Sequence, residues 1–480
     1  MLLSDPSLLK QQAFIDGQWF DSEHKFAVLN PATAQVITQV TDCDSKITEK
    51  SVQAAQRALP SWSALTAKQR GAILNRWFEL IMDNQQDLAT LMTLEQGKTL
   101  SEANGEVAYG ASFIQWFAEE AKRQYGEVIP SANPNQRLLT IRQPVGVVAA
   151  ITPWNFPIAM ITRKAAPALA AGCTMIVKPS EETPLCALAL AELAQRAGLP
   201  QGVLNIVTGL DSKAIGGVLT KSPIVRKLSF TGSTQVGKLL LRQCADTVKR
   251  TSMELGGNAP FIVFDDADLD EAVAGAIASK FRNSGQTCVC SNRILVQEDV
   301  YDQFTDKLTA ALKQFKLGNG LETGVNMGPL INRAAVDKVN ALVSQAISAG
   351  AKVTTGGQQQ GDTLFYQPTV LTGVNAQMDI FNNEIFGPVA PLVKFTDEAQ
   401  AIELANATPF GLAAYFYASD MSRIWRVSEA LEYGMVGINE GLISNEVAPF
   451  GGIKESGIGR EGSRYGIEEY SEIKYLCMGI

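Results

Sequence analysis

Residues 145–157 have the sequence VGVVAAITPWNFP, in which an apolar run at 145–151 ends in a loop of prolines and aromatics. Three similar runs follow along the chain, at 174–178, 203–207 and 226–230. Short runs as uniformly apolar as these are typical of strands that are buried on both faces of a parallel sheet. This part of the chain therefore predicts a sheet that is covered by helices.

Each apolar run is followed by a segment with helical character. These segments are 158–171, 183–197, 212–220 and 234–245. Gly172 and Gly198 stand where helices commonly end, because glycine adopts the left-handed conformation of a C-cap at little cost. The alternation of strands and helices predicts βαβ units and a doubly wound α/β fold.

The segments before and after this region are predicted to form different structures. Residues 1–125 are predicted to be mostly helical, for example over 68–79 and 101–124. A second α/β region begins near Glu254, with strands expected at 260–264, 351–355 and 368–374 and helices expected at 268–283 and 334–349. The alternating stretch 470–478 predicts a last strand, which could equally well pair within its own subunit or with the sheet of another.

Length, charge and apolar content limit the class of protein. A chain of 480 residues suggests about three domains or lobes. Its 41 basic and 49 acidic residues give a net charge of −8, which argues against nucleic acid and membrane surfaces as partners. The N-terminus lacks the pattern of a signal peptide, and the longest apolar runs are broken well before the length of about 18 residues that a membrane span needs.

The cysteine and histidine counts exclude several chemistries. The seven cysteines are dispersed without a zinc-type pair, so neither a disulfide framework nor a metal site is expected, and a cytoplasmic location follows. The single histidine, His24, lies in a polar stretch near the N-terminus. Hydrolysis by a Ser-His-Asp or Cys-His arrangement is therefore excluded.

Two glycine-rich segments are candidates for phosphate binding. The G-x-G-x-x-G pattern at 457–462 lacks the preceding strand and the later acidic residue of a dinucleotide site, so a surface turn is expected there. The segment FTGSTQVG at 230–237 follows a predicted strand and opens a predicted helix, so N–H groups around Gly232 and Ser233 could hold a phosphate. A plain helix cap explains this second segment equally well.

Three polar residues lie in settings that packing alone does not explain. Cys288, in GQTCVC, follows a predicted helix end, where a thiol can be exposed in a crevice. Glu254, in MELGGN, is expected to be partly buried with a raised pKa, as a general base for water requires. Asn155 lies at the carboxyl end of the first strand and is a rigid amide donor suited to an oxyanion. An inert core cysteine, a surface glutamate and a packed loop are the structural alternatives.

The motifs PWNFP, FTGSTQVG, MELGG, GQTC and, at 384–388, EIFGP resemble those of the aldehyde dehydrogenase superfamily in order and spacing, over essentially the whole chain. More narrowly, MITRKA (160–165), FRNSGQTCVC (281–290) and NEGLIS (439–444) resemble succinate-semialdehyde dehydrogenases. The resemblance implies NAD(P)-dependent oxidation of succinate semialdehyde to succinate. A dehydrogenase for glutarate semialdehyde or another ω-carboxylic aldehyde is the alternative.

The resemblance also implies a domain organisation. Residues 1–124 and 144–253 would form the NAD(P)-binding domain, and residues 254–446 the α/β catalytic domain. Residues 125–143 and 447–480 would form a small β oligomerisation element and the C-terminal tail. Homodimers and homotetramers are both usual in the superfamily.

The resemblance assigns catalytic roles to the three polar residues. Cys288 would attack the aldehyde, Asn155 and the Cys288 backbone N–H would hold the oxyanion, and Glu254 would activate the water that releases the acid. Their presence disfavours a catalytically silent structural homologue, and Glu254 disfavours a CoA-dependent acylating enzyme. Cys290 is implied as the partner of Cys288 in a reversible disulfide that switches activity off, with a passive small side chain as the alternative.

The family match also assigns binding residues. For the cofactor they are Trp154, Lys178, Glu181, Gly232, Ser233, Glu384 and Phe386. A carboxylate at Glu181 can accept a hydrogen bond from the 2′-hydroxyl of NAD but repels a 2′-phosphate, so NAD is predicted and NADP stays open. For the substrate they are Arg163, Arg282 and Ser444, since guanidinium groups suit a distal carboxylate. Structural ion pairing is the alternative for both arginines.

Overall fold

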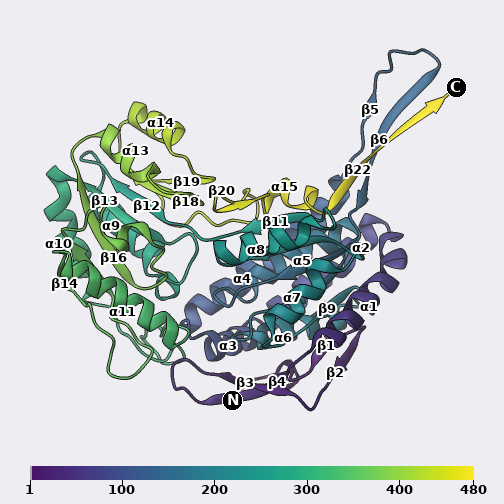
Figure 1. The fold of residues 1–480 in the computed structure, drawn as a ribbon, viewed down its shortest axis with the longest axis horizontal. Helices are drawn as coiled ribbons and strands as arrows, with labels where there is room; N and C mark the ends of the chain where they lie inside the picture. The colour runs from purple at the N-terminus through teal and green to yellow at the C-terminus, as the bar shows by residue number, and fades with distance from the viewer. Residues whose placement is uncertain (1–2) are drawn as a thin grey trace.

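The computed structural model describes residues 3–480 and contains two large sheets, each with helices on both faces, and a small sheet that projects from the body (Figure 1). The first sheet has the strand order β2-β1-β9-β8-β7-β10-β11-β21. Its strands are β1 Ala13–Ile15, β2 Gln18–Phe20, β7 Val147–Ile151, β8 Thr174–Lys178, β9 Leu204–Ile206, β10 Val225–Thr231, β11 Arg250–Glu254 and β21 Gly457–Ile458. The central strands from β9 to β11 are all parallel.

Helices bury both faces of the first sheet. They are α1 Ser45–Ser63, α2 Ala67–Asp83, α3 Gln85–Gln96, α4 Leu100–Glu120, α5 Ala159–Ala171, α6 Pro184–Arg196, α7 Ser212–Lys221 and α8 Thr234–Ala245. Val148 and Ala150 of β7 pack into the core built by α2, α4, α5 and α6, whereas Val147 and Ala149 pack into the core built by α1, α7 and α8. Successive strand residues point to opposite faces, so burial on both sides explains the continuous apolar run.

The second sheet has the order β14-β15-β16-β13-β12-β18-β19. Its strands are β12 Ala259–Val263, β13 Ser291–Gln297, β14 Lys352–Thr355, β15 Thr369–Thr372, β16 Val389–Phe395, β18 Ala413–Tyr417 and β19 Met435–Ile438. Its helices are α9 Leu269–Lys280, α10 Tyr301–Leu312, α11 Arg333–Ser348, α12 Asp379–Asn382, α13 Glu398–Asn406 and α14 Met421–Ala430. The first two helices cover one face, and the other four cover the opposite face.

The predicted doubly wound fold is confirmed, and the predicted core elements match the structure to within a few residues. The strand order reverses between β7 and β10, because β8 and β9 lie on one side of β7 while β10 and β11 lie on the other. Ligands of such sheets bind at the carboxyl ends of the strands beside this switch point. The loop after β7 and the N-terminus of α8 therefore lie where a ligand is expected.

The prediction of a mostly helical N-terminal region is partly wrong. Residues 13–41 form β1, β2 and a separate pair, β3 Lys25–Leu29 with β4 Val36–Thr41. Asp16 and Gly17 connect β1 to β2 with positive φ values of 52° and 71°. An Asp-Gly sequence between apolar residues is a strong hairpin signal, so the amino-acid sequence did contain the information needed to predict the β1–β2 hairpin.

The prediction of a surface turn at 457–462 is also wrong. Gly457 and Ile458 form β21, which pairs antiparallel with β11 at the edge of the first sheet. Glu461, three residues later, is 4% exposed. The short helix α15 Ser463–Glu468 follows, and a further small sheet joins β17 Phe410–Gly411 to β20 Ile453–Lys454. The glycines here allow the chain to approach the sheet edge closely.

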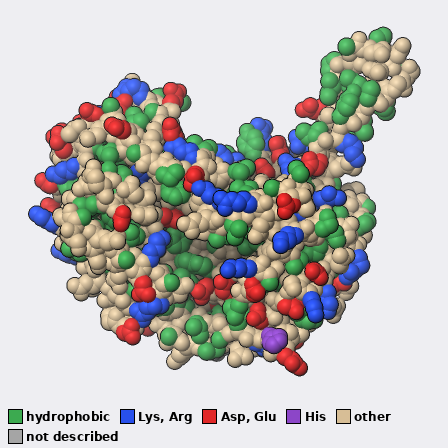
Figure 2. All heavy atoms as spheres, viewed as in Figure 1, with side chains coloured by type: hydrophobic (Ala, Val, Ile, Leu, Met, Phe, Trp, Pro, Cys, Tyr) green, Lys and Arg blue, Asp and Glu red, His purple; other side chains and the backbone are tan. Residues whose placement is uncertain are grey.

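The projecting sheet contains β5 Val128–Ile129, β6 Gln136–Pro144 and β22 Ser471–Gly479. β22 pairs with β6 of its own chain over nine residue pairs, from Ser471 opposite Pro144 to Gly479 opposite Gln136. This sheet extends away from both large sheets, and apolar side chains are visible on it (Figures 1 and 2). None of the helices within residues 3–480 is long and apolar enough to cross a membrane.

Candidate active site

A cleft of about 270 Å³ opens at the carboxyl ends of β7, β10 and β11. Its walls include the predicted residues Trp154, Asn155, Gly232, Ser233, Glu254, Cys288, Glu384 and Phe386. A second, smaller pocket is lined by Arg163, Arg282 and Ser444 together with Tyr109, Phe156, Met160, Thr287, Cys288, Val289 and Phe450. Cys288 lines both, so the predicted nucleophile lies between the predicted cofactor cleft and the predicted substrate pocket.

The loop that carries Cys288 is folded tightly. Asn283, Ser284 and Gly285 have consecutive positive φ values of 52°, 56° and 75°. Such a run is costly for residues other than glycine and persists only where surrounding contacts hold it. A Cβ on Gly285 would lie 2.2 Å from the carbonyl oxygen of Gly387, so glycine is required for the close approach of the EIFGP loop.

Burial decides the protonation state of the Cys288 thiol. It raises the thiol pKa to about 12, and the carboxylates of Glu254 and Glu384 act in the same direction, whereas Arg163 opposes them. A thiol with this pKa is protonated at neutral pH, yet only a thiolate is strongly nucleophilic. The proton must therefore leave the sulfur during the reaction.

Glu254, the last residue of β11, carries a buried carboxyl group. It is 4% exposed, and its Oε2 atom has no hydrogen-bond partner within the described chain. Burial and the nearby carboxylate of Glu461 raise the pKa of Glu254 well above its usual value, against the opposing effect of Arg163 and Lys164. A Cβ on Gly451 would lie 2.9 Å from Glu254 Oε1, so the glycine leaves room for the carboxylate. A raised pKa makes the ionised carboxylate a stronger base, as a general base requires.

Asn155 is held in place by the Cys288 loop. Its Nδ2 atom donates to the carbonyl of Gln286 at 3.0 Å, and this bond uses one of the two N–H groups of the amide. Asn155 and Cys288 line the same cleft. The other N–H is therefore available to the oxygen of a group bound to the sulfur.

Several hydrogen-bond donors around the smaller pocket have no partner within residues 3–480. They are the Nε atoms of Arg163 and Arg282, the Tyr109 hydroxyl and Thr287 Oγ1. The Arg163 guanidinium carbon lies 3.9 Å from the ring centroid of Phe450, and its Nη2 lies 2.8 Å from Glu461 Oε2. Buried donors without acceptors cost free energy, so an anionic group that enters this pocket gains both charge pairing and hydrogen bonds.

The predicted cofactor residues fall into two sets. Lys178 and Glu181 do not line the cleft; Lys178 is the last residue of β8, and its Nζ lies 2.8 Å from Glu181 Oε2. Glu384 lines the cleft and accepts a hydrogen bond from the Gly257 N–H at 3.2 Å. Ser233 is the N-cap of α8 and lines the cleft, so the cleft borders a helix N-terminus, which is a suitable place for a phosphate.

The structure adds residues that the sequence did not reveal. Lys338 of α11 lines the cleft, and Tyr109 of α4 lines the smaller pocket. Glu461 pairs with both Arg163 and Lys164. No local pattern marks these residues, because each reaches the site from an element that is distant in the sequence.

Cys290 is buried beside the catalytic loop. Its Sγ donates a hydrogen bond to the carbonyl of Lys280 at 3.3 Å, and burial raises the pKa of this thiol. The predicted disulfide with Cys288 stays a prediction. Within residues 3–480, no group of three His, Cys, Asp or Glu side chains is placed to hold a metal ion, and His24 is exposed.

Comparison with known proteins agrees with this geometry. Residues 19–476 match the profile of the aldehyde dehydrogenase family. The chain belongs to the aldehyde dehydrogenase family. It is 61% identical to a glutarate-semialdehyde dehydrogenase of Pseudomonas putida and 59% identical to a succinate-semialdehyde dehydrogenase of Escherichia coli whose name specifies NADP(+), with each pair aligned over 100% of both chains. A crystal structure described as an E. coli NADP-dependent enzyme superposes with a TM-score of 0.99 at 59% identity, and covers 100% of both chains.

The resemblance to aldehyde dehydrogenases inferred from the motifs is thus confirmed. The family makes the chain an oxidoreductase that acts on a small aldehyde with a nicotinamide cofactor. The two relatives named above differ in the aldehyde that their names specify, which is glutarate semialdehyde for one and succinate semialdehyde for the other.

The raised pKa of Cys288 predicts how this aldehyde dehydrogenase reacts with iodoacetamide in the absence of cofactor. Because the thiol pKa is about 12, the thiolate fraction should grow about tenfold per pH unit between pH 6 and 9, without a plateau. Alkylation of the Cys288 peptide, followed by mass spectrometry, measures this. A plateau below pH 8 would show that a stable thiolate exists in the free protein and would contradict the effect of burial.

Proposed function

We propose that this aldehyde dehydrogenase oxidises succinate semialdehyde to succinate, with glutarate semialdehyde as the alternative substrate. The observation that carries the proposal is the set of unpaired donors around the smaller pocket, on Tyr109, Arg163, Arg282 and Thr287. An aldehyde without a distal anion would leave the Nε donors of both arginines without a hydrogen bond, although Arg163 would keep its ion pair with Glu461. The names of the two relatives support an ω-carboxylic aldehyde and leave its length open.

The two candidate substrates differ only in the length of their carbon chain. Succinate and glutarate semialdehyde differ by one methylene, and one methylene is worth about 1–3 kcal/mol of discrimination. Both substrates place an aldehyde at Cys288 and a carboxylate toward the arginines and Ser444. We therefore propose a substrate with a distal carboxylate, and we place succinate semialdehyde before glutarate semialdehyde.

In the proposed reaction, the Cys288 sulfur attacks the aldehyde carbon, and the thiol proton passes to the Glu254 carboxylate in the same cleft. Asn155 and the Cys288 backbone N–H stabilise the oxyanion of the thiohemiacetal. Collapse of this oxyanion expels hydride and leaves a thioester on Cys288. Glu254 passes the thiol proton on to solvent and, as a carboxylate again, removes a proton from water, which attacks the thioester. The carboxylic acid is released, and the sulfur leaves as thiolate and takes back the proton that Glu254 accepted from water.

The cleft suits a nicotinamide nucleotide, which supplies the hydride acceptor when it is bound. Ser233 and Gly232 would hold the pyrophosphate at the N-terminus of α8, and Glu384, fixed by the Gly257 N–H, would hold a ribose hydroxyl. Phe386 contacts Trp154 edge-to-face, with ring centroids 5.6 Å apart, and would support the nicotinamide side of the cleft. Lys178 would lie near the adenosine ribose.

We infer that NAD is preferred over NADP. The Glu181 side chain is 41% exposed and pairs with Lys178, so its carboxylate remains close to where a 2′-phosphate would lie. Lys178 offsets part of the repulsion, and the E. coli relative is named for NADP(+), so use of both cofactors stays open.

Association with further copies of the chain is also part of the proposal. The projecting sheet exposes Val128, Ile473, Tyr475, Met478 and Ile480, with exposed fractions of 49–85%. So much exposed apolar surface on one small sheet favours a covered interface, in a homodimer or a homotetramer. A monomeric mass in sedimentation velocity would contradict this. The cytoplasmic location and the domain boundaries predicted from the sequence remain predictions as well.

Replacement of Arg282 tests the distal-anion proposal. Arg282→Met should lower kcat/KM for succinate semialdehyde roughly 100-fold, because the substrate carboxylate loses a charged donor, and should change it less than about threefold for butanal. NADH formation at 340 nm measures both. Arg333→Met removes an exposed ion pair with Asp362. It is the matched control and should leave kcat/KM for both aldehydes unchanged. An equal loss for both aldehydes would reject an anion clamp.

Replacement of Glu181 tests the cofactor proposal. Wild-type protein should favour NAD at least tenfold in kcat/KM, and Glu181→Gln should shift the ratio toward NADP by about tenfold, since removal of the carboxylate removes the repulsion. Glu182→Gln is the control, because the adjacent carboxylate bonds instead to Asn332 at 2.8 Å. A wild-type preference for NADP, or an unchanged ratio in Glu181→Gln, would place Glu181 away from the ribose.

A further inference from the structure

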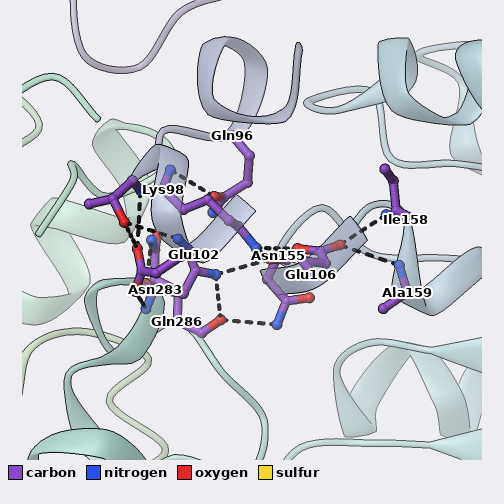
Figure 3. Close-up of polar contacts among 10 residues, drawn as sticks. Gln96, Lys98, Glu102, Glu106, Asn155, Ile158, Ala159, Asn283 and Gln286 are labelled. Carbon is purple, nitrogen blue, oxygen red and sulfur yellow. Dashed lines mark hydrogen bonds and ion pairs between the residues drawn. The ribbon is translucent and has the colours of Figure 1, made fainter. Parts of the chain in front are cut away.

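A buried polar network lies against the backbone of Asn155. Its centre is Lys98, which follows α3 and is 2% exposed (Figure 3). The Lys98 Nζ atom donates to the Asn155 carbonyl at 2.8 Å, pairs with Glu106, and lies 4.0 Å from the ring centroid of Phe156. Lys98 thus contacts the backbone and the next side chain of the loop that carries the proposed oxyanion donor.

Glu106 fixes the other end of the same loop. Its Oε1 atom accepts hydrogen bonds from the N–H groups of Ile158 at 3.0 Å and Ala159 at 3.3 Å, at the start of α5. Its Oε2 atom pairs with Lys98. The ion pair therefore connects the carbonyl of Asn155 to the first turn of α5, and both charges have partners although they are buried.

The network also reaches the loop of the nucleophile. Asn283 Nδ2 donates to the same Asn155 carbonyl at 3.0 Å, and the Asn283 N–H donates to Glu102 Oε1 at 2.7 Å (Figure 3). The Asn155 amide in turn donates to the Gln286 carbonyl. Both acceptor positions of the Asn155 carbonyl are thereby used, one by Lys98 and one by the loop that leads to Cys288.

We propose that Lys98 is a positioning residue for the reaction, which fixes the Asn155 amide relative to the Cys288 sulfur through the Asn155 carbonyl and the Glu106 ion pair. Lys98 lines neither the cleft nor the smaller pocket, so it does not contact cofactor or substrate. Its ammonium acts on the backbone of Asn155, and an oxyanion donor is effective only when its placement is accurate. The inference rests on the proposed role of Asn155 in holding the oxyanion.

A double-mutant cycle with Lys98→Met, Asn155→Ala and the combined variant tests the proposal. Lys98→Met should lower kcat for succinate semialdehyde by about 10- to 100-fold, with KM and the affinity for NAD within about threefold of wild type. In the Asn155→Ala background the same replacement should change kcat less than about threefold, because the side-chain amide that Lys98 positions is absent.

Two further variants make the test specific. Lys249→Met removes a largely buried lysine that bonds to the carbonyls of Ser222 and Val225 near the amino end of β11, and it should leave kcat unchanged. Asn283→Gly removes the second donor to the Asn155 carbonyl and suits the φ of 52° at that position. It should lower kcat and show the same loss of effect in the Asn155→Ala background, which provides the test if Lys98→Met fails to fold.

The outcomes separate this inference from the proposed function. If Lys98→Met lowers kcat by the same factor with and without the Asn155 side chain, Lys98 does not act through Asn155 and the inference is wrong. If Lys98→Met and Asn283→Gly both fold and leave kcat at the wild-type value while Asn155→Ala is impaired, the inference is also wrong but the proposed role of Asn155 stands. If Asn155→Ala itself keeps the wild-type kcat, the proposed function of that residue fails.

Discussion

The ion-pair cluster of Glu461 with Arg163 and Lys164 connects the parts of the site. Both cations lie on the buried helix α5, and both pair with one carboxylate that the C-terminal segment brings back to the first sheet. Arg163 lines the smaller pocket, while Lys164 also donates to Thr231 Oγ1 at 2.6 Å, on the wall of the larger cleft. Without Glu461, two buried positive charges would lose their partner, which is strongly destabilising.

Burial also determines the chemistry that this site can perform without histidine. A thiol and a carboxyl group line one cleft, and desolvation by the surrounding protein raises the pKa of both. The repulsion between Glu461 and Glu254 adds to the effect on the base. The Nε donors of Arg163 and Arg282 are buried as well, and within residues 3–480 they have no hydrogen-bond partner. Burial therefore favours each of the roles proposed for these residues: a proton acceptor, a nucleophile that reacts only when its proton can leave, and a pocket for an anion.

Much of this arrangement could be predicted from local sequence. The parallel strands are continuous apolar runs, and Cys288, Glu254 and Asn155 lie in short motifs at strand and helix ends. The hairpin at Asp16-Gly17 was missed although its turn signal was present. Lys98, Tyr109, Lys338 and Glu461 could not be found, because each acts through contacts with residues that are distant in sequence; Glu461 bonds to a lysine 297 positions away. Long-range pairing of buried charges leaves no periodic pattern in the chain.

The central claim is that Cys288 carries the oxidised substrate until Glu254 activates water. Incubation of Glu254→Gln with NAD and succinate semialdehyde, followed by rapid acid quenching and peptide mass spectrometry, tests it most directly. The account predicts that a succinyl thioester forms more slowly than in the wild-type protein, because the variant side chain cannot accept the thiol proton. The thioester then accumulates to one per subunit on the Cys288 peptide, together with one equivalent of NADH and little turnover. Turnover at the wild-type rate, or an adduct on any other residue, would contradict it.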